Sequence, residues 1–354
     1  MEVEPMSKLS DVALSVLDLA PVAAGKTPAD AFRNTLDLAQ HVERLGYKRF
    51  WLAEHHNMPG IASAATSVLI GYVAAGTSSI RVGSGGVMLP NHAPLVIAEQ
   101  FGTLDALYPG RIDLGLGRAP GTDANTSYAL RRGLNSDGRD FPELLAELQR
   151  YLGPPNASQR VRAYPGTNSN IPIWLLGSSD FSARLAAELG LPFAFASHFA
   201  PEELHAAISI YRKRFQPSAQ LEKPYVMVGV PVIAAQSDQE AIRLASTSMQ
   251  KFLALIRGKP IQGQPPVDNM DEFWTAYEKE AVMSRLAIAA IGSAQTVQDK
   301  LAQLLDATDA DELMVVSDFY HHQDRLHSYE ILAGLQNKNE KGSGDLVRAS
   351  FREH

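Results

Sequence analysis

Two adjacent histidines, His55 and His56, follow a carboxylate at the end of an apolar run that is rich in aromatic residues. An imidazole titrates near neutral pH and can serve as a general acid or base. Adjacent side chains on a strand point to opposite faces, so we expect only one of the two to face the interior. The alternative is that one histidine packs and the other caps the following loop. No carboxylate accompanies them at helical ligand spacing, so we expect no metal.

An arginine and a group of serines form a second candidate site. Arg118 follows Gly115-Leu116-Gly117 at the end of one apolar run, and Ser178, Ser179 and Ser182 follow the next run, where a helix opens. An arginine can make a forked contact with a phosphate, and the free N–H groups of a helix N-terminus also bind anions. The sequence therefore predicts a two-sided phosphate site. The alternatives are an ion pair between Arg118 and a loop acid such as Asp123, and ordinary helix capping by the serines.

Three glycines interrupt another apolar run, in the segment Gly83-Ser84-Gly85-Gly86. Glycine weakens a strand, so its presence indicates a bulge or a backbone that a ligand approaches closely. Tight packing of the strand against a helix would explain the glycines equally well. The sequence does not decide between these two interpretations.

Short apolar runs alternate with amphipathic segments along nearly the whole chain. Such alternation is typical of parallel strands that are buried on both faces. Eight units favour a closed (β/α)8 TIM barrel over an open doubly wound sheet, which is the main alternative. The predicted strands are Val12–Leu19, Tyr47–Ala53, Ile80–Leu89, Arg111–Gly117, Pro172–Leu176, Pro192–Ser197, Tyr225–Ala235 and Glu312–Val316.

The predicted helices include Pro28–Leu45, which has Thr27 as its N-cap and Gly46 at its end. The others are Ser63–Ala75, Pro94–Leu107, Phe141–Leu152, Phe181–Leu189, Pro201–Phe215, Asp238–Arg257, Thr296–Leu305 and Leu326–Leu335. Residues 258–292 interrupt the alternation and are predicted to be an insertion before strand eight, with a helical piece from Met270. We expect one domain over residues 1–336 and a polar tail over residues 337–354.

Composition excludes several classes of protein. The chain has 354 residues, a net charge of −7 and no cysteine. The acidic balance argues against nucleic-acid binding, and the lack of cysteine excludes disulfides and thiolate metal sites. The N-terminus has no signal-peptide pattern, and no apolar run reaches the roughly 20 residues that a membrane span needs. We expect a cytoplasmic protein that binds neither membranes nor nucleic acids.

Four segments together resemble the bacterial-luciferase-like flavin monooxygenases, and more closely their single-chain oxidoreductase subgroup. These segments are WLAEHHN (51–57), VGSGGVMLPNHAPLVIAEQFGTLDALYPGRIDLGLGRAPG (82–121), LGSSDFSARLAAELG (176–190) and the run from Ala290 to Ala333. The second segment is specific to the family, whereas EHH alone would not be. The resemblance covers nearly the whole chain outside the insertion and the tail.

The resemblance implies a TIM barrel with FMN at the C-terminal mouth. It assigns Arg118, Ser178, Ser179 and Ser182 to the FMN phosphate. It assigns Gly85 and Gly86 to a backbone segment that supports the flavin ring, often through a non-proline cis peptide. His55 matches the catalytic histidine of the family and His56 its neighbour. The light-emitting subunit has a reactive cysteine where this chain has Gly117, so long-chain aldehyde bioluminescence is not expected.

The implied chemistry is monooxygenation: reduced FMN (FMNH2) and O2 form a flavin C4a-peroxide that oxidises a small organic substrate. A flavin reductase would supply FMNH2. The family usually pairs through the helices after strands two and three, and the nearly uncharged segment Ser63–Ala75 predicts a homodimer here. Two alternatives are a deazaflavin-dependent hydride-transfer enzyme and a flavin-binding protein without turnover.

Overall fold

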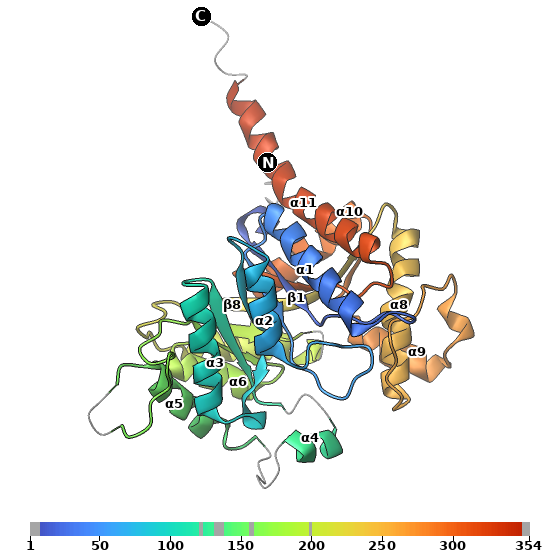
Figure 1. The fold of residues 1–354 in the computed structure, drawn as a ribbon. Helices are drawn as coiled ribbons and strands as arrows, with labels where there is room; N and C mark the ends of the chain where they lie inside the picture. Colours follow the sequence, from blue (N-terminus) through green and yellow to red (C-terminus); the bar gives the residue numbers. More distant parts are fainter. Residues whose placement is uncertain (1–7, 120–122, 131–137, 156–158, 198–199, 349–354) are drawn as a thin grey trace, which may run out of the picture.

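Eight parallel strands close into a barrel in the computed structural model, which describes residues 8–119, 123–130, 138–155, 159–197 and 200–348 (Figure 1). The last barrel strand pairs with both the first and the seventh, as Leu313 does with Leu14 and Val228. The predicted (β/α)8 barrel is confirmed, and an open sheet is excluded. In ring order the strands are β1 (Ala13–Asp18), β2 (Arg49–Leu52), β3 (Arg81–Ser84), β5 (Ile112–Gly117), β6 (Ile173–Gly177), β7 (Phe193–Phe195), β8 (Val226–Ala234) and β10 (Glu312–Val316).

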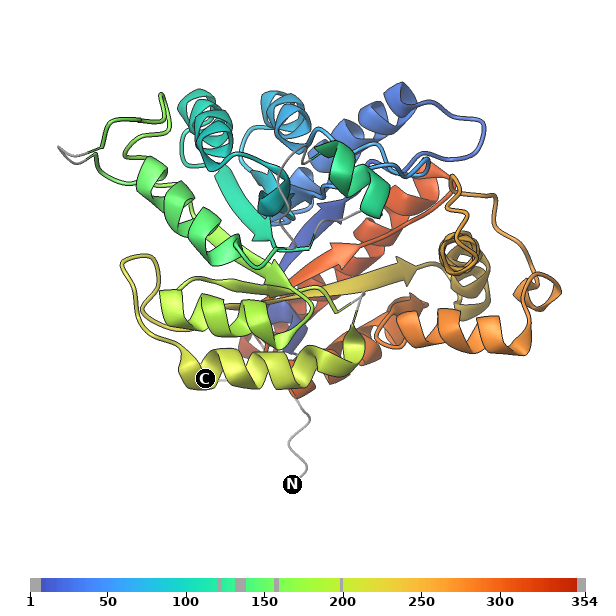
Figure 2. The same cartoon turned by 90° about the horizontal axis from the view of Figure 1, so that it is seen from below.

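Helices surround the barrel on the outside (Figures 1 and 2). The first begins as predicted, because Thr27 and Asp30 form a capping box: the Asp30 N–H donates to Thr27 Oγ1 at 3.2 Å, and the Thr27 N–H donates to Asp30 Oδ2 at 2.8 Å. The surrounding helices are α1 (Pro28–Arg44), α2 (Thr66–Ala75), α3 (Pro94–Leu107), α5 (Phe141–Leu152), α6 (Asp180–Leu189), α7 (Leu204–Arg214), α8 (Asp238–Ile256), α10 (Ala294–Thr308) and α11 (His322–Arg348).

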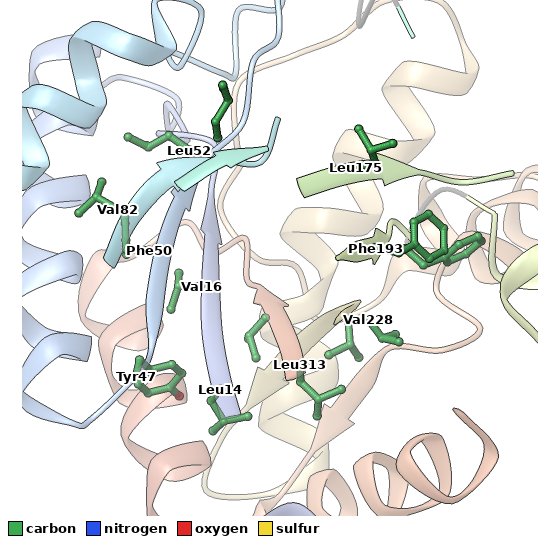
Figure 3. Packing of buried hydrophobic residues seen from close by; sticks show 14 of the residues in the cluster. Leu14, Val16, Tyr47, Phe50, Leu52, Val82, Leu175, Phe193, Val228 and Leu313 are labelled. Carbon is green, nitrogen blue, oxygen red and sulfur yellow. The ribbon is translucent and has the colours of Figure 1, made fainter. Parts of the chain in front are cut away.

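Alternation along each strand divides the buried side chains into two sets. On β1, Leu14 and Val16 belong to the large cluster between barrel and helices, whereas Leu17 belongs to a separate cluster inside the barrel. Figure 3 shows part of the outer set. The inner set is Leu17, Trp51, Ala53, Trp174, Ala194, Met227 and Met314. This inner layer forms the floor on which a site at the C-terminal end can rest.

Charged side chains fill the opposite, N-terminal end of the barrel. Arg49 donates to Asp113 at 2.7 Å and to Glu312 at 3.0 Å, and all three side chains are buried. Tyr225 also donates to Glu312, at 2.8 Å. Burial first, and then the Glu312 charge, raise the pKa of Tyr225 well above its usual value. Since these groups satisfy one another, this end has a structural role.

The predicted insertion lies between α8 and α10 and packs beside α8 (Figure 2). It contains α9 (Ala276–Arg285), and its short strand β9 (Ala290–Gly292) extends the sheet beside the end of β8. Its first part is tied to the N-terminal loop: Gly263 N–H donates to Val22 O at 3.0 Å, and Ala24 N–H donates to Gly263 O at 2.7 Å. The insertion is therefore an ordered wall of the barrel mouth.

Three features differ from the prediction. The third strand is interrupted, because β3 ends at Ser84 and β4 (Val87–Met88) follows separately. A short helix, α4 (Ala124–Leu130), lies between β5 and α5, where no strand or helix was predicted. Helix α11 continues to Arg348, past the predicted start of the tail, and projects from the barrel (Figure 1). Among the described helices, none is long and apolar enough to cross a membrane.

Candidate active site

A cavity of about 820 Å³ opens at the C-terminal ends of the strands. Its floor is the inner layer that includes Trp51, Met227 and Met314. One side is formed by the insertion, through Ile261 and Leu286 among others. The cavity is mostly apolar, and its polar side chains gather in three places. A volume of this size accommodates a cofactor together with a small substrate.

The first polar place lies where β5 and β6 end side by side. Gly117 pairs with Leu176 in register, so Arg118 and Ser178 leave the barrel next to each other. The Arg118 guanidinium lies 4.3 Å from the centre of the Phe181 ring, over the first turn of α6. Arg118, Ser178, Ser179 and Ser182 all line the cavity. These residues thus form the two sides of the predicted anion site.

The start of α6 is suited to an anion. Ser179 occupies the N-cap position, and its side chain makes no capping hydrogen bond, so the first N–H groups are not capped by it. Asp180 pairs with Arg184 at 3.0 Å on the exposed side of the helix, so its carboxylate points away from the cavity. A Cβ atom at Gly177 would lie 2.4 Å from Ser182 Oγ. Glycine at 177 therefore lets the buried Ser182 pack against the strand end.

A bulge at Gly85 and Gly86 also lines the cavity. Gly83 pairs with Asp113 and Val87 with Leu116, so three residues of one strand face two of the other. The peptide bond between Gly85 and Gly86 is cis. A Cβ atom at Gly86 would lie 2.8 Å from Gly115 O, and one at Gly85 would lie 2.7 Å from Leu17 Cδ1. The bulge interpretation is correct, and the close packing is between strand and strand rather than strand and helix.

The histidines form the second polar place, and both line the cavity. The expectation that only one would face the interior is wrong, because β2 ends at Leu52 and the strict alternation of a strand ends with it. Asn57, the next residue, has a φ of 55°, which continues this irregular path. His55 and His56 are both partly buried. Either imidazole can therefore contact a ligand in the cavity.

Glu54 is a buried carboxylate behind the histidines that the sequence alone did not single out. Its Oε1 lies 2.8 Å from Nε2 of His56 and 2.9 Å from Nε2 of His92, and its Oε2 accepts from the Met88 N–H at 2.9 Å. Burial would by itself raise the pKa of Glu54, but these hydrogen bonds outweigh it and lower the pKa to about 2. An ionised carboxylate only accepts, so both Nε2 atoms carry a hydrogen. Glu54 thus fixes His56 relative to the strand that carries the glycine bulge.

Asp123 is the loop acid with which Arg118 was alternatively expected to form an ion pair. Its carboxylate accepts from Thr126 Oγ1 at 2.6 Å and from Asn57 Nδ2 at 3.0 Å. These two hydrogen bonds, that of Thr126 first, lower its pKa. These two partners of Asp123 lie in its own loop and in the histidine segment, and the Asp123 side chain links the two.

The third polar place lies across the cavity, where β8, β10 and α8 meet. Lys251 and Asp318 form an ion pair, and Arg325 donates from Nη2 to the fully buried Asp18 at 2.7 Å. Lys251, Asp318 and Arg325 all line the cavity. These three residues were not predicted from the sequence. They come from three separate elements, so no local spacing brings them together in the sequence.

All eight residues predicted from the sequence line this one cavity: His55, His56, Gly85, Gly86, Arg118, Ser178, Ser179 and Ser182. Their assigned roles stay predictions. His92, in contrast, contacts Glu54 without lining the cavity. Within the described part of the chain, no group of three or more histidine or acidic side chains could hold a metal ion.

A parallel barrel with an apolar cavity at its C-terminal mouth is the architecture of an enzyme that encloses an organic ligand. The luciferase-like monooxygenase family model matches residues 12–311. The chain belongs to this family, and it is a flavin-dependent monooxygenase.

Relatives extend over almost the full length. A luciferase-like monooxygenase of Escherichia coli strain K12 is 55% identical, covering 90% of this chain and 96% of the relative. The N-acetyl-S-alkylcysteine monooxygenase of Bacillus subtilis strain 168 is 33% identical, covering 91% and 97%. The crystal structure of apo-MsnO8 is 38% identical with a TM-score of 0.82, covering 92% of this chain and 98% of that one.

More distant solved structures share the fold alone. The oxygenating constituent of 3,6-diketocamphane monooxygenase from Pseudomonas putida, in complex with FMN, is 19% identical with a TM-score of 0.66, covering 91% and 97%. A coenzyme F420 dependent tetrahydromethanopterin reductase from Methanopyrus kandleri is 15% identical with a TM-score of 0.61, covering 91% and 97%. The barrel fold alone therefore does not distinguish FMN from a deazaflavin as the cofactor.

Proposed function

We propose that this enzyme uses reduced FMN and O2 to oxidise a small organic substrate, with FMNH2 supplied by a separate flavin reductase. The observation that carries the proposal is the shared cavity, in which an anion-type site, a glycine bulge and two histidines lie together. Reduced FMN would supply the electrons that activate O2. The deazaflavin and non-catalytic alternatives are outcomes of the tests below.

Arg118 and the serines of α6 would hold the FMN phosphate. The guanidinium offers forked donors, and the start of α6 adds N–H groups and the partial positive charge of the helix. Gly85 and Gly86 line the cavity, so their backbone would support the flavin ring. The apolar floor, with Trp51 and Met314, would exclude water from the reacting atoms.

His55 would be the acid–base group beside the reacting atoms. His56 would assist, since Glu54 accepts from its Nε2 and orients the imidazole beside the cavity. A positioned imidazole contributes to catalysis when its proton lies within hydrogen-bond reach of the reacting group.

The substrate is proposed to be small and largely apolar, in keeping with the cavity wall. A thioether is the first group to test, because one relative is named for N-acetyl-S-alkylcysteine. Sulfur oxidation would insert one oxygen atom of O2 into the substrate, and the other would leave as water.

An isotope experiment tests the function. The protein is incubated with FMN, a flavin reductase, NADH and 18O2, together with a panel of thioethers, and the products are analysed by mass spectrometry. We expect one 18O atom in a product that forms only when protein and FMN are both present. If F420 replaces FMN as the productive cofactor, or if all reducing equivalents appear as hydrogen peroxide for every substrate, the proposal is wrong.

A further inference from the structure

We infer that the Lys251–Asp318–Arg325 end of the cavity binds a carboxylate with a neighbouring N–H group, so that the substrate is an N-acylated amino acid with an apolar side chain. This inference rests on the proposed function, because it names the substrate class of the same cavity. The position of this end of the cavity, its charges and its hydrogen-bonding groups support the inference.

The position separates this end from the proposed cofactor site. Arg118 and Ser178 leave β5 and β6, whereas Asp318 follows β10 and Lys251 lies on the helix after β8. In the ring of strands, β10 lies opposite β5. Between the two ends the cavity is lined by apolar side chains such as Met227, Val316 and Ile233. A ligand that touches the charged end would therefore place its apolar part toward the proposed flavin.

The charges that line this end favour an acid. Lys251 pairs with Asp318, and Arg325 pairs with Asp18, so the four charges sum to zero. Asp18 is fully buried and does not line the cavity, so the charges that line it are two positive and one negative. A charged pair in an apolar wall is costly unless its groups are satisfied. A carboxylate would meet the two cations, and a neighbouring N–H would meet the Asp318 carboxylate.

Hydrogen-bonding capacity is left over at the same place. Within the described part of the chain, Asp318 Oδ1 and Arg325 Nε are buried and have no hydrogen-bond partner. Arg325 is only 3% exposed, and its contact with Asp18 uses Nη2. Buried polar groups are normally paired, so hydrogen-bonding capacity is left over in two side chains that line the cavity, although the two atoms themselves do not lie on its surface.

The wall around this end sets the shape of the ligand. Phe252 and Leu255 come from α8, and Leu286 and Ile291 from the insertion. The acid group would sit close to this wall, and the apolar side chain would extend along the floor past Met314. A thioether in that side chain would lie toward the flavin end of the cavity.

Binding to the flavin-free protein tests the inference independently of turnover. The probes are N-acetyl-S-methyl-, S-hexyl- and S-benzylcysteine, each compared with its methyl ester. Binding is followed by calorimetry and by the change in tryptophan fluorescence, since Trp51 lines the cavity. We expect at least one acid to bind ten times more tightly than its ester. If no acid binds, or if the esters bind equally well, the inference is overturned.

Variants of Lys251 and Asp318 test whether these side chains contact the carboxylate of the probe. Lys251→Met should remove the preference for the acid, and so should the double variant Lys251→Met/Asp318→Asn, which leaves no unpaired charge. The control is Arg243→Met, on the same helix, whose partner Asp268 lies at the surface. FMN affinity should be unchanged in all three, which separates this result from a failure of the cofactor site. Retention of the acid preference in both Lys251 variants would contradict the inference.

Discussion

At the scale of single residues, the two histidines are proposed to have different roles. His56 is bound to Glu54, whereas His55 is the residue that the family resemblance assigns to catalysis. If His55 is the acid–base group, His55→Ala should fold and bind FMN, because a loop histidine adds little to core packing. Turnover should fall by roughly 10²–10⁴.

Steady-state turnover of the substrate found with 18O2 measures this effect, with the exposed His205→Ala as a control. Turnover near that of the wild type would move the acid–base role to His56. A variant that fails to fold would instead make His55 a structural residue.

The lowered pKa of Glu54 predicts how the free energy of unfolding depends on pH. Its pKa is lowered to about 2, so its ionised form stabilises the fold above the unfolded-state pKa of about 4.5, and this stabilisation is lost as the pH falls toward 2. Between pH 5 and pH 3 the wild type should lose about 2 kcal/mol of unfolding free energy that Glu54→Gln does not lose. Urea unfolding at both pH values measures the difference. Equal losses in the two proteins would show that the hydrogen bonds do not hold Glu54 ionised.

Residue types alone predicted the glycine bulge, and they singled out Arg118 and the serines, which line the same cavity, because these are local patterns next to strand ends. They did not predict that both histidines would reach the cavity, since this depends on β2 ending at Leu52. Glu54 was visible next to the histidines, but its contact with His92 joins residues 38 positions apart.

At the scale of elements, the strands and helices were predictable because apolar runs and helix caps are local features of the sequence. Thr27 and Pro28 fixed the start of α1 in this way. The break between β3 and β4 was not predictable in detail, since it depends on how closely Gly86 approaches β5. The insertion was recognised by its failure to alternate, but its attachment to Val22 and Ala24 depends on contacts across more than 200 residues.

At the scale of the whole molecule, an apolar surface remains on α2 and α3. Val68 is 69% exposed and Tyr72 41%, both on α2, and Val96, which like Val68 lies in the first turn of its helix, is 43% exposed on α3. Exposed apolar side chains that gather on adjacent helices mark an interaction surface. We propose that a second copy of the chain covers them, which agrees with the pairing implied by the family.

Val68→Glu should therefore convert a dimer into a monomer, because a charge would be buried at the interface. Ile242→Glu serves as a control, since Ile242 is 58% exposed on α8. Sedimentation velocity at micromolar concentration measures the mass of each protein. A monomeric wild type, or a dimeric Val68→Glu, would refute this interface.

The central claim is that Arg118 and the start of α6 hold the phosphate of FMN. The most direct test is to titrate FMN and riboflavin, which lacks the phosphate, into the wild type and Arg118→Ala. Loss of a charge-assisted contact should weaken FMN binding by about 1.5–3 kcal/mol, roughly tenfold or more, and leave riboflavin binding unchanged. Arg184→Ala, on the exposed side of α6, should change neither affinity. Unchanged FMN affinity in Arg118→Ala, or an equal loss for riboflavin, would contradict the account.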